Sequence, residues 1–551
     1  MISPAMTPFG QLMQVFAASR KLEDPLIRRS VDDLLGAIRR ERELRFFVDG
    51  TPNCGHQAAT IHIMKRIISM TGFAGRVTIV YADIHQGTLG RTPDKLALLF
   101  TGLVPARIDT SILEYETCKD IRFLDYDNRD SLAGHVQFGF TGGADDMTIN
   151  FAADLKVNYF LRIQPYLWDD DSSKKQDRFY QSSRLETPAG RFFYPVDDYP
   201  PFRNLPCKFS KTVCAVSEAT WNWYARDQNF DPQLKRRTNN ARTLYQAQQQ
   251  AGLRIWPVYG LHQFREHAAE MAMNLALTGL QVQRETPGPV AVLVLMPPSE
   301  IPEFLQLLAP FARDLAEANN DLQSFSAALT ARYEDQLRAE GAFSREHLDV
   351  FVAQIANQIQ PCVRAKASVT LLSGYDTQTA SYLDISGMLS EAVNGAGPNS
   401  LIVALIGPVP GEIYNYFYST SSMPGVFEGQ HTSSLAISMG RPFLQIPREV
   451  TGIRNPYPAT VASDDFSTIA STANAAASQL RDQQYEAYLR RTNAAEPREY
   501  MAQLRKTAEF ILQAQDPESS IYRYFQALGD YFQEDIHDKL FAGLMAQVLS
   551  T

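Results

Sequence analysis

Short apolar runs alternate with amphipathic stretches along most of the chain, and this alternation predicts an α/β protein. In the N-terminal part, the apolar run 45–50 leads into a polar loop with a glycine at 51–60. An amphipathic stretch at 61–72 and a second apolar run at 75–83 follow. Strand, loop, helix and strand in this order form a βαβ unit, which indicates a parallel sheet.

The second half of the chain repeats this alternation after a segment rich in Pro and Gly at 283–290. Apolar runs at 290–297, 368–374 and 399–407 predict strands, and the stretches between them have helical spacing. Such an alternation is typical of a second parallel sheet.

We therefore expect two Rossmann-like domains that face a cleft, followed by helices. The N-terminal domain is expected at 1–285 and the C-terminal domain at 286–470. A helical tail at 471–551 completes the chain, and its return to the N-terminal domain is one arrangement that we consider.

The composition indicates which partners and which cellular compartment to expect. The chain has 551 residues and a formal net charge of -9, which makes it a poor candidate for wrapping duplex nucleic acid; a local basic patch stays open as an alternative. Its 5 cysteines are scattered without CxxC spacing, which argues against a disulfide scaffold or a structural zinc site and favours a reducing compartment.

The hydrophobic pattern also bears on location. No apolar run approaches the roughly 20 residues of a membrane helix, and no basic segment followed by an apolar core marks the N-terminus. We expect a cytoplasmic protein without a membrane span, and export without an N-terminal signal stays open.

The first loop with candidate chemistry runs from the first predicted strand into the first predicted helix. In open α/β sheets, ligands bind beyond the carboxyl ends of the strands, which is where this loop lies. Asp49 and His56 are its two groups able to take a proton, and the small Gly55 lets a ligand approach the backbone. The same residues are also explained without a function, if Asp49 forms a turn and His56 is a histidine at a helix end.

The second loop precedes the helix predicted near 432–440. A glycine-containing loop that opens a helix presents unpaired N–H groups and the positive end of the helix dipole, which suits a phosphate. Ordinary helix capping would select similar residues. The candidate binding residues are Glu428, Gly429, Gln430, His431, Thr432 and Ser433.

Together, the two loops resemble those of GT-B glycosyltransferases. Pro52-x-x-Gly55-His56 is similar to the acceptor-side loop of that family, where a glycine-histidine pair opens the first long helix. Gly429, Thr432 and the later Gly440-x-Pro442 resemble the donor-binding signature, in which a strand ends at a proline, here Pro447.

Within that fold, the chain most resembles the bacterial elongation-factor-P arginine rhamnosyltransferases. Asp49 and Gly55 fall on their pattern, and Asn53 replaces their second acidic residue. Glu428-Gly429-Gln430-His431-Thr432 stands where that family has Arg-Gly-Glu-Asp-Ser, and Leu435 stands where small-molecule GT-B enzymes have a ribose-binding Glu.

The resemblance implies an inverting, metal-independent transfer of a hexosyl or deoxyhexosyl group from a nucleotide-sugar. The donor would be linked to UDP, TDP or GDP, and the acceptor would be a protein or a small molecule. Asp49 or His56 would deprotonate the acceptor, and the loop around 428–433 would hold the diphosphate. No further cofactor is expected.

Two alternatives remain at this stage. One is a sugar-nucleotide epimerase on the same fold, and the other is an inactive protein that binds a nucleotide-sugar. The motifs HExxH, GxxxxGK[ST] and GxSxG are absent, so the sequence does not indicate a zincin, a P-loop enzyme or a hydrolase of those types.

Overall fold

The predicted βαβ unit is present in the computed structural model of the chain. Strand β1 (Glu43–Val48) leads into α3 (Gly55–Thr71), and β2 (Arg76–Tyr81) pairs parallel with β1. Helix α3 begins earlier than the amphipathic stretch predicted, because residues 55–60 already belong to it. It ends before Gly72, whose left-handed φ of 64° stops the helix.

The structure describes most of the chain, and the following account concerns those residues alone. They are 25–51, 54–83, 90–142, 151–162, 182–184, 206–227, 231–295, 301–318, 321–341, 344–364, 366–446, 457–458, 465–482, 497–534 and 537–541. Pro52, Asn53 and Pro447, which contribute to the family resemblance, lie outside them.

The described chain is an α/β protein with two parallel-rich sheets, which confirms the expected class. It divides into two compact units. The first comprises Met1–Val213, Gln430–Gly440 and Leu528–Thr551, and the second comprises Cys214–Gly429 and Arg441–Ala527.

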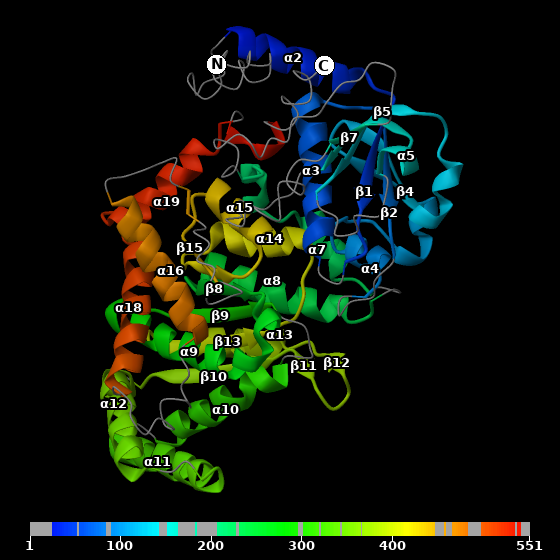
Figure 1. The fold of residues 1–551 in the computed structure, drawn as a ribbon. Helices are drawn as coiled ribbons and strands as arrows, with labels where there is room; N and C mark the ends of the chain where they lie inside the picture. The colour runs from blue at the N-terminus through cyan, green and yellow to red at the C-terminus, as the bar shows by residue number, and fades with distance from the viewer. Residues whose placement is uncertain are drawn as a thin grey trace. The chain divides into compact units, whose positions relative to one another are not determined.

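The sheet of the first unit has seven strands in the order β3-β4-β2-β1-β5-β6-β7 (Figure 1). The inner five are parallel, and β3 and β7 are antiparallel edge strands. The strands not yet given are β3 (Ile112–Tyr115), β4 (Cys118–Asp125), β5 (Val136–Thr141), β6 (Val157–Arg162) and β7 (Ser182–Arg184).

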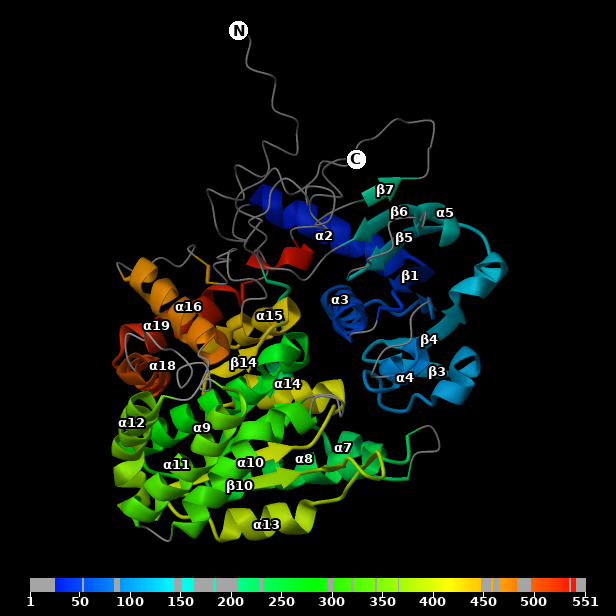
Figure 2. The same ribbon diagram turned by 60° about the horizontal axis from the view of Figure 1, so that its bottom comes forward.

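Strand β1 is central in this sheet because its side chains are apolar on both faces. Phe46, Phe47 and Val48 have no exposed surface, and Phe46 stacks on Phe140 of β5 with ring centroids 5.2 Å apart. Helix α3 packs beside β1 and β5 (Figure 2). The other helices of this unit are α2 (Pro25–Arg40), α4 (Thr92–Ala97), α5 (Phe151–Asp154) and α15 (Gln430–Ser438).

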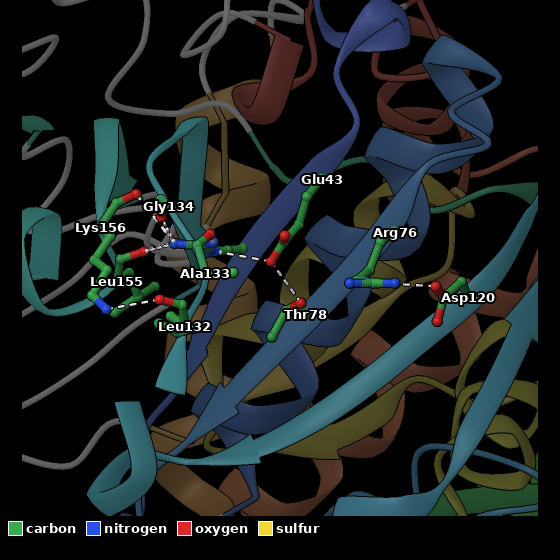
Figure 3. A network of polar contacts seen from close by, with 10 residues as sticks. Glu43, Arg76, Thr78, Asp120, Leu132, Ala133, Gly134, Leu155 and Lys156 are labelled. Atoms are coloured by element: carbon green, nitrogen blue, oxygen red, sulfur yellow. Dashed lines mark hydrogen bonds and ion pairs between the residues drawn. The ribbon is translucent and has the colours of Figure 1, made fainter. Parts of the chain in front are cut away.

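A polar network closes the amino end of this sheet (Figure 3). The guanidinium of Arg45 donates to four carbonyls, those of Ala133, Gly134, Leu155 and Lys156, over 2.6–3.2 Å. Its Nε also donates to Glu43, whose carboxylate accepts from Thr78 as well.

The second unit contains a six-stranded sheet in the order β10-β13-β9-β8-β14-β15, all parallel. Its strands are β8 (Arg254–Tyr259), β9 (Val290–Leu295), β10 (Ser368–Ser373), β13 (Ser400–Leu405), β14 (Gly425–Phe427) and β15 (Phe443–Gln445). Strand β9 is buried along its whole length, which is the reason for its unbroken apolar run.

The strands predicted at 290–297, 368–374 and 399–407 are thus β9, β10 and β13. A short hairpin, β11 (Tyr375–Asp376) with β12 (Ser381–Tyr382), follows β10. The helices of this unit are α7 (Glu218–Tyr224), α8 (Leu234–Gln250), α9 (Ala268–Glu285), α10 (Ile301–Glu317), α11 (Leu322–Ala339), α12 (Arg345–Arg364), α13 (Ser386–Asn394), α14 (Gly411–Thr420), α16 (Phe466–Asp482) and α18 (Pro497–Gln515).

The boundary expected at residue 286 falls inside the second unit. Strand β8 pairs with β9 over six residue pairs, so residues 254–259 belong to the second sheet rather than to the first. The expected helical tail is also divided. Helices α16 and α18 pack on each other and on α9 in the second unit, and the chain rejoins the first unit at Leu528, within α19 (Ser520–Tyr531).

Candidate functional site

The strand order of the first sheet locates its candidate binding site. From β1 the chain continues through β2 and β4 towards one side, whereas β5 and β6 lie on the other side. The carboxyl ends of β1 and β5 are therefore the point where the strand order reverses, and ligands of open α/β sheets bind at such points. Asp49 follows β1 directly, and Gly142 follows β5.

Helix α3 is fixed against this point by small and polar residues. The N–H of Gly142 donates to Thr60 Oγ1 over 2.8 Å, and Thr141 Oγ1 donates to the carbonyl of Phe47 over 2.9 Å. A Cβ atom at residue 142 would lie 2.3 Å from the backbone nitrogen of Thr60. Only glycine lets β5 and α3 approach this closely, and this approach positions the start of α3.

Asp49 and His56 lie together at the carboxyl end of β1. His56 Nδ1 is 3.7 Å from Asp49 Oδ2, and the two side chains are 10% and 4% exposed. The loop between them is short because α3 starts at Gly55, so His56 stands in the first turn of the helix. The two candidate bases are thus close enough to contact the same ligand atom or to interact with each other.

Gln57 fixes the backbone at Asp49 through hydrogen bonds. Its amide nitrogen donates to the carbonyl of Asp49 over 2.6 Å and to that of Thr51 over 3.2 Å. Gln57 has no exposed surface. Because buried hydrogen bonds of this kind restrict the backbone, the loop presents Asp49 in a defined place.

Lys95 is a buried cation at the same edge of the sheet. Its side chain has no exposed surface, and its Nζ donates to the carbonyl of Thr51 over 2.5 Å. Helix α4 carries it there because Asp83, after β2, accepts from the N–H of Thr92 and from Arg91 Nε. Burial lowers the pKa of Lys95, and the nearby Cys54 and acidic groups act in the opposite direction.

Cys54 precedes α3 at the site and is half-buried. Burial raises the pKa of its thiol to about 11, although the positive charge of Lys95 opposes the shift. A thiol with such a pKa is protonated near neutral pH, so Cys54 is not an activated nucleophile. Among the described residues, no group of three His, Cys, Asp or Glu side chains has the arrangement of a metal site.

The expected donor loop is divided between the two units. Glu428 and Gly429 follow β14 in the second unit, at the reversal of strand order between β8 and β14. There, Gly260 after β8 has a φ of 84°, and a Cβ atom on it would lie 2.9 Å from the Cβ of Glu428. Gln445 Nε2 donates to the carbonyl of Glu428 over 3.1 Å.

The rest of the expected donor loop forms the start of α15, which belongs to the first unit. The helix begins at Gln430, one residue before His431. Thr432, Ser433 and Leu435 are buried. The N-terminus of a helix is the positive end of its dipole, which favours an anion.

His431 packs against α3 rather than standing alone on its helix. Its ring lies edge-on to His62 of α3, with centroids 5.3 Å apart, and 5.1 Å from the ring of Phe209. Phe209 stacks on His62 at 3.7 Å. These three rings, which we call the histidine cluster, join three separate segments of the first unit.

Both histidines of the cluster favour the neutral form. Burial lowers the pKa of His431 to about 4. Burial also holds the pKa of His62 well below its usual range, and the charges of His431 and Arg66 act in the same direction. His62 Nε2 contacts the carbonyl of Lys208 at 2.9 Å, which requires a proton on that nitrogen.

The structure thus brings Asp49, which follows β1, together with Gly55 and His56 in the first turn of α3, and α15 with its His431 belongs to the same unit. Glu428 and Gly429 lie at the carboxyl edge of the other sheet. Sequence reasoning missed Lys95 and Gln57. Gln57 has no signal of its own in the sequence, since it directly follows the candidate pair Gly55-His56. A lysine in the short helical stretch 92–97 is usually solvent-exposed.

Two further findings complete the description. None of the helices that the structure describes has both the length and the apolar character needed to cross a bilayer. No family model matches the chain, and no curated protein matches it significantly.

Proposed function

We propose that this chain is a glycosyltransferase that moves a sugar from a nucleotide-sugar to an acceptor with inversion at the anomeric carbon. Asp49, next to His56, acts as the base that deprotonates the acceptor. The positive N-terminal end of α15 stabilises the diphosphate that leaves.

One observation carries this proposal: α15 packs on α3 through the histidine cluster. Because a helix rises 1.5 Å per residue, His62 lies about 9 Å along the axis of α3 from His56. His431, in the first turn of α15, contacts His62. A candidate base and a helix start suited to a phosphate are thus neighbours within one unit.

The chemistry follows from this arrangement. The acceptor hydroxyl or amide gives its proton to Asp49, and its heteroatom attacks the anomeric carbon as the bond to the diphosphate oxygen breaks. Positive helix ends favour the negative charge that develops on the leaving group. The scheme needs no metal ion, because the helix N–H groups act where a cation would.

A panel of UDP-, TDP- and GDP-linked sugars tests the proposal. Binding is measured by thermal shift, and release of the nucleoside diphosphate is followed by mass spectrometry with mixtures of candidate protein and small-molecule acceptors. We expect one class of donor to stabilise the protein and to lose its sugar. A panel without any stabilising donor would contradict the proposal.

Substitution of the base then tests the roles. A positioned general base contributes about 10²–10⁴-fold to the rate, so Asp49→Asn should lower turnover by that factor and leave donor binding little changed. His56→Ala should lower turnover less than Asp49→Asn does, and it should weaken the binding of donor or acceptor more. Asp120→Asn, on β4 near the amino end of the same sheet, is the matched control and should be neutral.

The outcomes also separate the alternatives. Conversion of the donor sugar to its epimer without transfer would indicate an epimerase, and binding without any turnover would indicate an inactive nucleotide-sugar-binding protein. Equal activity of Asp49→Asn and the parent would remove Asp49 from the mechanism.

A further inference from the structure

Lys95 is an unusual residue for the interior of a protein. Its side chain has no exposed surface, although burying a charged ammonium group is costly unless partners compensate for it. Within the part of the chain that the structure describes, its hydrogen-bond acceptor is the Thr51 carbonyl alone.

The charges around Lys95 come from several elements. Cys54 lies at the start of α3, Asp83 follows β2, Asp49 follows β1, and Asp94 precedes Lys95 in α4; each of these interacts electrostatically with the ammonium group. His56 Nδ1 lies 3.7 Å from Asp49 Oδ2. Lys95 is therefore the buried positive charge of a site with several acidic groups.

The side chains of Lys95 and Gln57 both donate hydrogen bonds to the backbone at Thr51. Lys95 Nζ and Gln57 Nε2 both donate to the carbonyl of Thr51, and Gln57 also donates to that of Asp49. A neutral donor such as glutamine would be sufficient to hold this loop. A lysine at the same place adds a positive charge that interacts electrostatically with Asp49, whose side chain is 4% exposed.

We propose that Lys95 is a positioning residue of this site: it fixes the loop through the Thr51 carbonyl, and its charge keeps the Asp49 carboxylate ionised and ready to accept a proton. This role rests on the proposed function only in the task that it gives to Asp49. A lysine that merely filled the core would support the loop and leave the ionisation of Asp49 unchanged.

The test separates the charge of Lys95 from its hydrogen bond. Lys95→Gln keeps an N–H donor and removes the charge, whereas Lys95→Arg keeps a charge. The full-length protein is labelled with ¹³C at the aspartate carboxyl carbons, and the pH titration of each signal is followed by NMR. The Asp49→Asn variant identifies the signal of Asp49.

We expect the titration midpoint of Asp49 to rise by about one pH unit or more in Lys95→Gln, because a nearby opposite charge typically lowers the pKa of an Asp by about 1–3 units. In Lys95→Arg the midpoint should stay near that of the parent. An unchanged midpoint in Lys95→Gln would overturn the proposal, and so would equal shifts in both variants.

The experiment needs no substrate, so its result is independent of the donor panel. A shifted midpoint without sugar transfer would keep the role of Lys95 and reject the glycosyltransferase. If Lys95→Gln fails to fold, Lys95→Met replaces it, and the titration midpoint of Asp49 is measured over the pH range in which that variant stays folded. The same two results then decide.

Discussion

Arg45 shows how one buried side chain can organise a sheet. It has no exposed surface, and its guanidinium holds four backbone carbonyls from the segments that flank β5 and β6 (Figure 3). Arginine suits this task because its planar fork carries five donors and stays charged. Glu43, at 2.9 Å from its Nε, balances the charge.

Arg45→Met should therefore destabilise the protein strongly. The substitution leaves several buried carbonyls and the Glu43 carboxylate without their donor, so we expect a loss of about 3–5 kcal/mol in the free energy of unfolding. Urea unfolding followed by circular dichroism measures it. Arg122→Met is the control, because Arg122 is 46% exposed and surface pairs such as the one that it forms with Asp120 contribute about 0–1 kcal/mol. Similar losses in both variants would contradict this role of Arg45.

Single residues differ in how far the sequence predicts them. Asp49 and His56 could be chosen because the ends of parallel strands collect ligand-binding residues, whatever the rest of the chain does. Lys95 could not be chosen, since its burial depends on how Asp83 anchors α4. The histidine cluster could not be predicted either, because Phe209 and His431 are 222 residues apart in the chain.

At the scale of elements, the contact between α3 and α15 should depend on pH. The folded protein holds the pKa of His431 at about 4, below its ordinary value of 6.5. The unfolded chain therefore binds more protons between these values. The stability that the neutral ring contributes is complete above about pH 6.5 and is lost as pH falls towards 4.

We expect this histidine to remove up to about 3 kcal/mol of stability between pH 7 and pH 4. His431→Phe retains an aromatic ring and cannot be protonated, so the midpoint of its thermal unfolding should fall less with pH than that of the parent. His135→Phe is the control for a histidine outside the cluster. A parent and a His431→Phe variant with parallel pH curves would rule this contribution out.

The elements themselves were predicted well where local signals are strong. The βαβ unit follows from two apolar runs and from the stop at Gly72. Strand β8 shows the limit: its sequence, RIWPVY, indicates a strand, but only the pairing with β9 assigns it to the second sheet. Helix α15 is similar, since its sequence sets its bounds but not the unit in which it packs.

At the scale of the whole molecule, the first unit depends on the last part of the chain. Asp538 has no exposed surface, and its carboxylate accepts from Arg66 Nη2 over 2.8 Å and from the N–H of Lys208 over 2.9 Å. The N–H of Lys539 donates to the carbonyl of Pro206 over 2.9 Å. These contacts tie 206–208 and α3 to residues 537–541.

Asp538→Ala should weaken the first unit. Removal of one partner from a buried ion pair leaves the other charge uncompensated and costs about 3–5 kcal/mol. Hydrogen exchange of α3 amides, followed by mass spectrometry, should become faster, whereas exchange in β9 should not. Asp530→Ala, an exposed residue of the same C-terminal part, is the control. Unchanged protection of α3 in Asp538→Ala would contradict the dependence.

The ion pair between Arg66 and Asp538 joins residues that are 472 positions apart. A ribosome adds about 5–20 residues each second, so Arg66 leaves the exit tunnel tens of seconds before its partner has been made. Strands β1 to β6 can pair during that time, but α3 cannot gain its contact with Asp538 until that residue has been made. The packing of α3 is therefore completed long after α3 itself is translated, and a nascent chain stalled before Asp538 would expose this face of α3 to chaperones and proteases.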